Sequence, residues 1–184
     1  MGMGIKQFYA QATQKDFSRD FQLRVMEMGG VLVQEDNVYI TTSNLPGYQI
    51  HNQATPFMGL QFNVPGSGTF PGNDAWIVTF RCDQQLNIRQ KLINWQTTIF
   101  KAFPNMAGQS TGNYAPKGIE SVAKLIVHDR DGKTVRAVQL IGVWPVSIGE
   151  IAYDQTGNGT VVTLAATLAY QWWEPFDGPR DIIA

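Results

Sequence analysis

Short runs of alternating apolar and polar residues, each followed by turn residues, constrain this chain more than any other feature of its sequence. A period of two residues is typical of β-strands. The strands that we expect lie at residues 21–28, 38–42, 74–80, 122–128, 134–142 and 161–173. Strands that follow each other along a chain usually pair, so the first two are expected to be neighbours in one sheet.

One segment has a helical period instead. The members of its apolar stripe, spaced by four, three and four residues, are Ile88, Leu92, Trp95 and Ile99. This spacing predicts an amphipathic helix. Asn87 with Gln90 fits an N-terminal capping box, and Asp83 is an alternative cap. With one substantial helix among many strands, we predict a mainly β protein, a β-barrel or sandwich with one packed α-helix.

The length of 184 residues favours a single domain, 1–184, with one hydrophobic core. Residues 1–20 are expected to form an N-terminal arm or helix, and residues 175–184 a C-terminal tail. The segment 52–73 is rich in Pro and Gly but carries apolar residues that need a surface to pack on. We therefore interpret it as a projecting loop or hairpin. Its apolar residues are Phe57, Leu60 and Phe62.

The composition narrows the possible partners. Charged residues make up only 16% of the chain, against about 25% in typical soluble domains, and the net charge is -1. There is no excess of basic residues to hold nucleic acid. Either an uncharged polar exterior or apolar flanks hidden by neighbouring copies must account for the low charge. Because no apolar run approaches 20 residues, we expect no membrane anchor.

No catalytic or metal-binding spacing is found. The segment 132–134 (GKT) lacks the preceding glycine of a phosphate-binding loop. Asp129 and Asp131 lack the remaining ligands of a calcium loop. Cys82 has no second cysteine with which to form a redox or metal motif. We therefore predict a protein that is not an enzyme and that has no cofactor and no metal.

Several motifs together resemble a known family. They are Asp74–Trp76, Arg89–Gln96, Gly142–Pro145, Ile148–Glu150 and Thr167–Glu174. From about residue 17 to 174, the chain resembles the tail tube protein of T-even-type contractile-tailed phages. It is also similar to the tube proteins of type VI secretion and of contractile bacteriocins. It departs from the family pattern at residues 64–73, 108–118 and 175–184.

This resemblance implies a subunit that closes into hexameric rings, which stack helically into a hollow tube inside a contractile sheath. The implied partners are further copies of the chain, the tail sheath protein, and the baseplate and tail terminator proteins. The tape measure protein would occupy the lumen before ejection. DNA would then pass through without specific binding. The protein would be made in the host cytoplasm and reside in the virion tail.

The residues and the resemblance together suggest where contacts lie. Phe57, Leu60 and Phe62, with the N-terminal arm, are candidates for contacts between rings. Small side chains would leave a channel open, and the lumen candidates on this ground are Thr163, Ala165, Thr167, Ala169 and Gln171. The residues expected at subunit interfaces or in structural roles are Asp74, Trp76, Arg89, Gln90, Trp95, Gly142, Trp144, Pro145, Trp173 and Glu174.

Two further expectations follow from the same features. Trp172 and Trp173 are adjacent on a predicted strand and point to opposite faces, so one of them is expected at a subunit interface. A basic wall would retain DNA, so the wall is expected to be neutral or acidic. We therefore expect certain basic residues to lie at subunit seams or on the outer wall. They are Arg81, Arg89, Lys91, Lys124 and Arg136.

Other functions stay open at this point. A β-rich carbohydrate- or protein-binding module would use exposed tryptophans to stack on sugars. The tube of a contractile secretion or bacteriocin particle is a further alternative. Size-exclusion behaviour separates the first alternative from a tube subunit, because a binding module stays monomeric or forms small closed oligomers.

Overall fold

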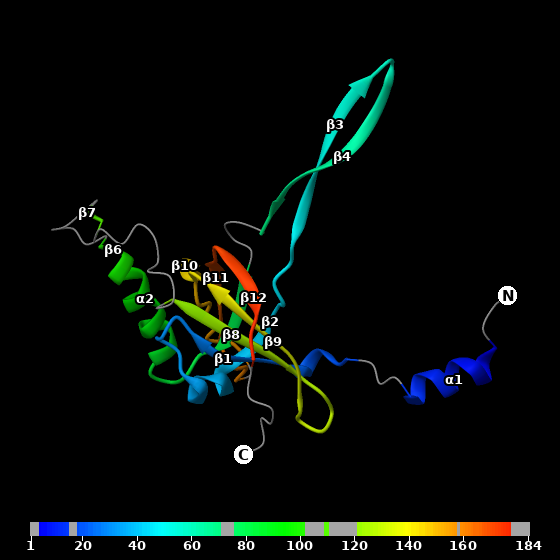
Figure 1. Ribbon diagram of the computed structural model, residues 1–184. Coiled ribbons are helices and arrows are strands. Elements are labelled where there is room, and N and C mark those ends of the chain that lie inside the picture. Colours follow the sequence, from blue (N-terminus) through cyan, green and yellow to red (C-terminus); the bar gives the residue numbers. More distant parts are fainter. Residues whose placement is uncertain are drawn as a thin grey trace.

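Two four-stranded antiparallel sheets form the body of the molecule (Figure 1). The computed structural model describes residues 4–14, 18–70, 76–101, 109–110, 121–157 and 159–177. Sheet A has the order β1-β8-β9-β12, with β1 at Leu23–Met28, β8 at Val122–His128, β9 at Thr134–Ile141 and β12 at Trp172–Pro175. Sheet B has the order β10-β11-β5-β2, with β10 at Trp144–Ile148, β11 at Thr163–Ala169, β5 at Trp76–Arg81 and β2 at Ile40–Ser43.

The other elements are helices and two small strand pairs. The α-helices are α1 at Ile5–Gln14 and α2 at Asn87–Ile99, and the 3-10 helices are η1 at Asp20–Gln22 and η2 at Gln34–Tyr39. One pair joins β3 at Gln49–Phe57 to β4 at Leu60–Thr69, and the other joins β6 at Phe100–Lys101 to β7 at Gln109–Ser110. The β3–β4 hairpin and α1 both extend away from the body (Figure 1).

No helix in the described ranges is both long enough and apolar enough to cross a membrane.

One hydrophobic core lies between the two sheets, as in a β-sandwich. Sheet A contributes buried residues such as Leu125 and Leu140, and sheet B contributes Phe80 and Leu164. The apolar stripe of α2 joins the same core through Ile88, Leu92 and Trp95. Over the residues that the structure describes, the sheets do not close into one barrel. The sandwich form of the predicted fold is therefore the one present.

Strand β5 shows how the alternation in the sequence produces this arrangement. Its even-numbered residues, Trp76, Val78 and Phe80, are buried, whereas Ile77 and Arg81 are exposed. The strand lies between β11 and β2, as predicted for a central strand. The β8–β9 hairpin predicted at 122–142 is also confirmed.

The prediction of one strand over residues 161–173 is wrong. β11 ends at Ala169 in sheet B, and β12 begins at Trp172 in sheet A. Between them, the backbone N–H of Gln171 donates to the carbonyl of Ile141, 2.9 Å away, and leads the chain to β9. The alternation continues across this change of sheet, so the pattern alone does not reveal it.

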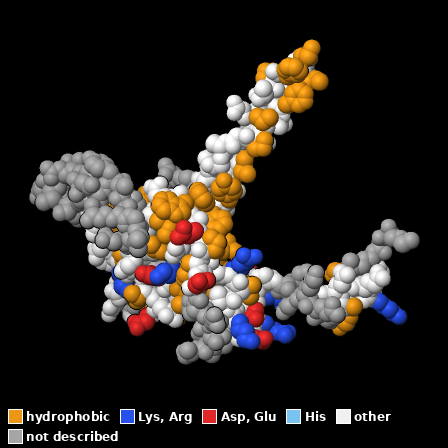
Figure 2. All heavy atoms as spheres, viewed as in Figure 1, with side chains coloured by type: hydrophobic (Ala, Val, Ile, Leu, Met, Phe, Trp, Pro, Cys, Tyr) orange, Lys and Arg blue, Asp and Glu red, His pale blue; other side chains and the backbone are white. Residues whose placement is uncertain are grey.

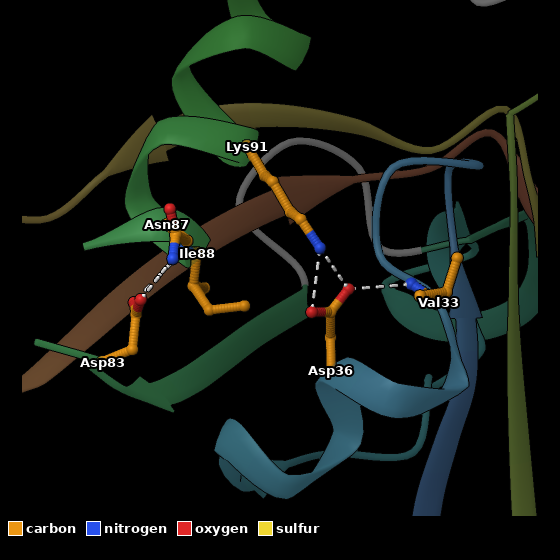
Figure 3. A network of polar contacts seen from close by, with 6 residues as sticks. All are labelled: Val33, Asp36, Asp83, Asn87, Ile88 and Lys91. Atoms are coloured by element: carbon orange, nitrogen blue, oxygen red, sulfur yellow. Dashed lines mark hydrogen bonds and ion pairs between the residues drawn. The ribbon is translucent and has the colours of Figure 1, made fainter. Parts of the chain in front are cut away.

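The expected pairing of the first two strands is also wrong. β1 pairs with β8 in sheet A, and β2 pairs with β5 in sheet B. The helix η2 separates them along the chain, and Asp36 holds η2 in place. One carboxylate oxygen of Asp36 accepts a hydrogen bond from the Val33 N–H at 3.0 Å (Figure 3). Both oxygens accept from the Lys91 ammonium of α2, at 2.8 and 2.9 Å.

The start of α2 is capped by Asp83 and not by the Asn87–Gln90 capping box. Asn87 donates its amide to Asp83 at 2.8 Å, and the Ile88 N–H lies 3.5 Å from the other carboxylate oxygen (Figure 3). Gln90 instead donates to the side chain of Asn94. Desolvation alone would raise the pKa of Asp83, but the hydrogen bonds from Asn87 and Ile88 outweigh it and hold this pKa below its ordinary value.

The packing of α2 gives a first prediction. Replacing Leu92 with alanine removes a fully buried side chain and leaves a cavity between helix and sheets. We expect Leu92→Ala to lower the free energy of unfolding by about 2–5 kcal/mol in urea denaturation. Asn94→Ala, on the exposed side of the same helix, is the control and should cost well under half as much. Equal losses for both variants would contradict this packing.

The cap of α2 gives a second prediction. Because the folded-state pKa of Asp83 is depressed, its charge stabilises the fold above the unfolded pKa, and this contribution is lost as the pH falls through the folded pKa. Asp83→Asn should therefore lower the melting temperature at pH 7, and the difference from wild type should shrink below about pH 4. The neutral change Gln84→Asn is the control. A difference that persists unchanged into acid would contradict the role of the charge.

Candidate functional site

The β3–β4 hairpin exposes almost its whole length to solvent. Every residue of β3 is exposed, and so is every residue of β4 except Thr69. Its tip is a two-residue turn in which Met58 and Gly59 have positive φ angles of 47° and 81°. The hairpin therefore lies where the sequence predicts one at 52–73, although β3 begins at Gln49. Residues 71–73 lie outside the described ranges.

One face of this hairpin is apolar. The register pairs Phe57 with Leu60 and Thr55 with Phe62, and side chains on paired residues point the same way. Phe57, Leu60 and Phe62 are thus neighbours, with the two phenyl rings 6.4 Å apart. Gln61, between two of them, points to the opposite face. The three predicted contact residues form a single surface.

The hairpin also lacks charge. Residues 37–73 contain no Asp, Glu, Lys or Arg, although such residues make up 16% of the chain. In Figure 2 the hairpin is orange and white along the visible side, up to an orange tip. Charged residues normally protect exposed strand edges from pairing, and an isolated two-stranded hairpin is at best marginally stable in water. This surface is suited to contact with protein.

Helix α1 presents a second apolar surface. Ile5, Phe8 and Tyr9 are all largely exposed, and the helix stands apart from the body (Figure 1). A ten-residue helix is short for independent stability in water. Contact with another protein surface would supply the burial that α1 lacks.

The outward face of sheet B carries three of the five lumen candidates. Thr163, Ala165 and Thr167 lie along β11, opposite Arg81, Thr79 and Ile77 of β5. Thr163 and Ala165 are exposed, and Thr167 is half-buried. The side chains of this face are small on β11, and β5 adds the larger Ile77 and, at its end, Arg81. That Arg81 lies at a subunit seam or on the outer wall stays a prediction.

The other two lumen candidates lie elsewhere. Ala169 is completely buried at the end of β11, where it pairs with Trp144 of β10. It cannot line a channel without rearrangement of the subunit. Gln171 is exposed, but it belongs to the link between β11 and β12 and not to the face of sheet B.

The residues expected at subunit interfaces or in structural roles lie partly in the core and partly at the surface. Trp76, Trp95, Gly142 and Pro145 are buried, so they serve the subunit's own packing. Trp76 also donates to the Ser43 hydroxyl at 3.1 Å. Trp144 and Trp173 are half-buried, and Arg89, Gln90 and Glu174 are exposed. Glu174 accepts a hydrogen bond from Gln139. Asp74 lies outside the described residues.

A groove of about 800 Å³ separates the outer strands of the two sheets. β1 and β2 are edge strands, and residues of both line the groove. Phe21 and Val38 lie on its rim, 69% and 72% exposed. The wall formed by residues 37–44 belongs to the uncharged stretch. The groove is therefore open at two strand edges and partly apolar.

The described part of the chain shows little that resembles a metal-binding or catalytic site. In the described part of the chain, no group of three or more His, Cys, Asp or Glu could hold a metal ion. Burial, with the neighbouring Asp83 carboxylate, raises the pKa of the Cys82 thiol against the opposing effect of Arg89. The thiol is therefore mostly protonated at neutral pH and is a weak nucleophile.

Two features of the site were not predicted from the sequence. Tyr48 and Phe70 flank the hairpin and pack at its base, near Trp173. Nothing local marks this contact, because Trp173 is more than a hundred residues away in sequence. The uncharged stretch 37–73, by contrast, is visible in the sequence and would have identified both the hairpin and one wall of the groove.

Comparison with solved structures places the fold among tubes and caps of contractile machines. A PVC sheath/tube terminator of an extracellular contractile injection system gives a TM-score of 0.60 at 11% identity, covering 89% of this chain and 99% of that one. The cap of the anti-feeding prophage gives 0.57 at 13% identity, covering 89% and 93%. A chain of the PVC sheath–tube complex gives 0.55 at 12% identity, covering 92% and 97%.

Relatives in sequence identify a narrower class of proteins than the solved structures do. The tail tube protein gp19 of Enterobacteria phage T4 is 31% identical over 164 residues, which cover 86% of this chain and 92% of that protein. Its counterpart in Enterobacteria phage T6 is 30% identical over the same coverage. No family model matches the sequence. The chain belongs to the family of phage tail tube proteins.

Proposed function

We propose that this tail tube protein forms hexameric rings that stack helically into the inner tube of a contractile phage tail, and that the lumen conducts the genome into the host. Membership of the tail tube family supports the role of tube subunit. The observation that carries the assembly is the uncharged hairpin, whose apolar face has no cover within the described part of the subunit.

Ring closure would use the edges of the sheets. β2 and β10 end sheet B, and β1 and β12 end sheet A. Edge strands left open in a monomer can pair with the edges of a neighbour, so that sheets continue from copy to copy. A head-to-tail contact of this kind generates a ring when its rotation closes.

Stacking would use the hairpin. β2 leads into β3 and β4 leads back to β5, so the hairpin continues the β2–β5 ribbon out of sheet B. It projects from one end of the body (Figure 1). Phe57, Leu60 and Phe62 would anchor it in a copy of the next ring, and the β1–β2 groove is our candidate for the receiving surface. Helix α1 would make a second axial contact.

The lumen wall would be the outward face of sheet B. Thr163, Ala165 and Thr167 are small enough to leave a bore open, and the face carries little charge. Every additional basic contact would strengthen DNA binding by counterion release, so a nearly neutral wall favours free passage. Arg81 lies at the end of β5 farther from the hairpin, where it would face the rim of the ring.

The other partners follow from the place of a tube in a tail. They are the tail sheath protein outside, the baseplate and tail terminator proteins at the ends, and the tape measure protein in the lumen. Neighbours in fold come from a sheath–tube complex and a sheath/tube terminator, which supports the tail sheath and tail terminator proteins as partners. The protein would be made in the host cytoplasm and reside in the virion tail.

The alternatives have weaker support. A sugar-binding module would display tryptophans, but Trp76 and Trp95 are buried in the core and Trp144 and Trp173 are half-buried, which leaves only Trp172 exposed. The tube of a secretion or bacteriocin particle would share the fold. Solved injection-system components are 11–13% identical to this chain, however, and phage tail tube proteins 30–31%. The phage role therefore has the more specific support.

Charge placed on the hairpin tests the proposal. Phe62→Asp would bury an unpaired carboxylate in the ring-to-ring contact, at a cost of several kcal/mol per contact. We expect hollow cylinders from the wild type, given a nucleating template, and rings without cylinders from Phe62→Asp, by negative-stain electron microscopy. Gln61→Asp adds the same charge on the other face and should still form cylinders.

Two results would contradict the proposal. Cylinders of normal length from Phe62→Asp would exclude the apolar face as the axial contact. A wild-type protein that remains a solitary particle at high concentration, even with a template, would exclude the tube itself.

A further inference from the structure

Three aromatic side chains gather where the hairpin leaves the body. Tyr48 precedes β3, Phe70 follows β4, and Trp173 comes from β12. The rings of Tyr48 and Phe70 meet edge to face with centroids 5.2 Å apart, and those of Phe70 and Trp173 with centroids 6.2 Å apart. Both geometries are favourable for aromatic pairs. We call these three residues the aromatic base cluster.

Trp173 connects the cluster to sheet A. It lies in β12 of sheet A, opposite Leu140, and packs against the hydrophobic core. Its indole N–H donates to the carbonyl oxygen of Gly47 at 2.9 Å. The hairpin itself emerges from sheet B. Trp173 therefore holds the segment that leads into β3 to sheet A, whereas the hairpin emerges from sheet B.

The base of the hairpin is also closely packed on its own strands. A Cβ added at Gly68 of β4 would overlap the Tyr48 hydroxyl, so Tyr48 lies directly against that backbone. His51 and the Thr69 hydroxyl are hydrogen-bonded across the two strands at 3.0 Å. A bulge interrupts the register between Ile50 and Asn52. These contacts hold the two strands of the hairpin together at its base, so that the hairpin moves as one unit.

We propose that the aromatic base cluster fixes the direction of the hairpin before any other copy is met, and that Trp173 is the positioning residue for axial stacking. This rests on the proposed role of the hairpin as the axial contact. Nine strand residues span about 30 Å, so a rotation of about 10° at the base moves the tip by about 5 Å. A preset direction avoids the entropic cost of ordering the hairpin during assembly.

The sequence supplies a matched control. Trp172 is the same residue type on the same strand, but it is 43% exposed and lies outside the cluster. Trp173→Ala and Trp172→Ala therefore delete equal side chains, and only the first removes contacts to Phe70 and Gly47. Tyr48→Ala is the second test variant. Its side chain is more than half exposed and does not belong to the core, so this protein should fold.

The first readout is the direction of the hairpin in unassembled protein. Spin labels are placed at Gln61→Cys on the hairpin and Asn94→Cys on α2, in a Cys82→Ser background. We call this doubly labelled protein, without further substitution, the parent. Pulsed electron paramagnetic resonance should give one narrow distance distribution for the parent and for Trp172→Ala. Trp173→Ala and Tyr48→Ala should lose the narrow peak, while melting curves show that both remain folded.

The second readout is assembly, scored by negative-stain microscopy. Trp173→Ala and Tyr48→Ala should give rings with few or no cylinders, whereas the parent should give normal cylinders. Trp173→Phe, which keeps a ring but loses the bond to Gly47, should fall between them. An unchanged narrow distribution in both Trp173→Ala and Tyr48→Ala would overturn the proposal, as would a broadened distribution with normal cylinders.

The two proposals fail in different ways. If the parent shows a narrow distribution that Trp173→Ala broadens, but the parent itself never forms cylinders, the tube function fails and the control of hairpin direction stands. If the parent forms cylinders and its hairpin is already broadly distributed beforehand, the positioning role fails and the tube function stands.

Discussion

Burial of apolar surface that one copy cannot cover is the constraint on which the rest of this structure depends. Phe57, Leu60 and Phe62 share one face of a hairpin that stands clear of the body, and the stretch that contains them is without charge. Exposure of such a face to water is unfavourable in free energy, and only contact with another surface removes this cost. Both the low charge of the chain and the projection of the hairpin therefore fit the need to place this apolar face against another surface.

The body provides a rigid support for that hairpin. Two sheets and α2 enclose a core in which Trp76 and Trp95 are buried, so most of the large aromatic area of the motifs stabilises the subunit itself. Asp36 joins η2 to α2, and Trp173 joins the hairpin base to sheet A. The surfaces that we propose for contact with other copies are the hairpin, α1 and the sheet edges, and the outward face of sheet B is proposed as the lumen wall.

The local periodicity of the sequence predicted the helix and those strands whose pattern lies within one segment of the chain. The stripe of α2, the alternation of β5 and the β8–β9 hairpin all occur where expected. Pairing between distant segments was not predictable in this way. The alternation from Val161 to Trp173 runs through a change of sheet, and Ala169, a residue expected to face a channel, is completely buried. For the site, sequence located the apolar hairpin, but not the Tyr48–Phe70–Trp173 cluster, whose members meet only through the tertiary fold.

The central claim is that neighbouring copies cover the hairpin. Hydrogen exchange followed by mass spectrometry tests it most directly, by comparing the amides of residues 49–69 in unassembled subunits and in assembled tubes. We expect fast exchange in the subunit, where the hairpin is solvated on both faces, and strong protection in the tube, with little change in β8 and β9. Equal exchange of these amides in both states would contradict it.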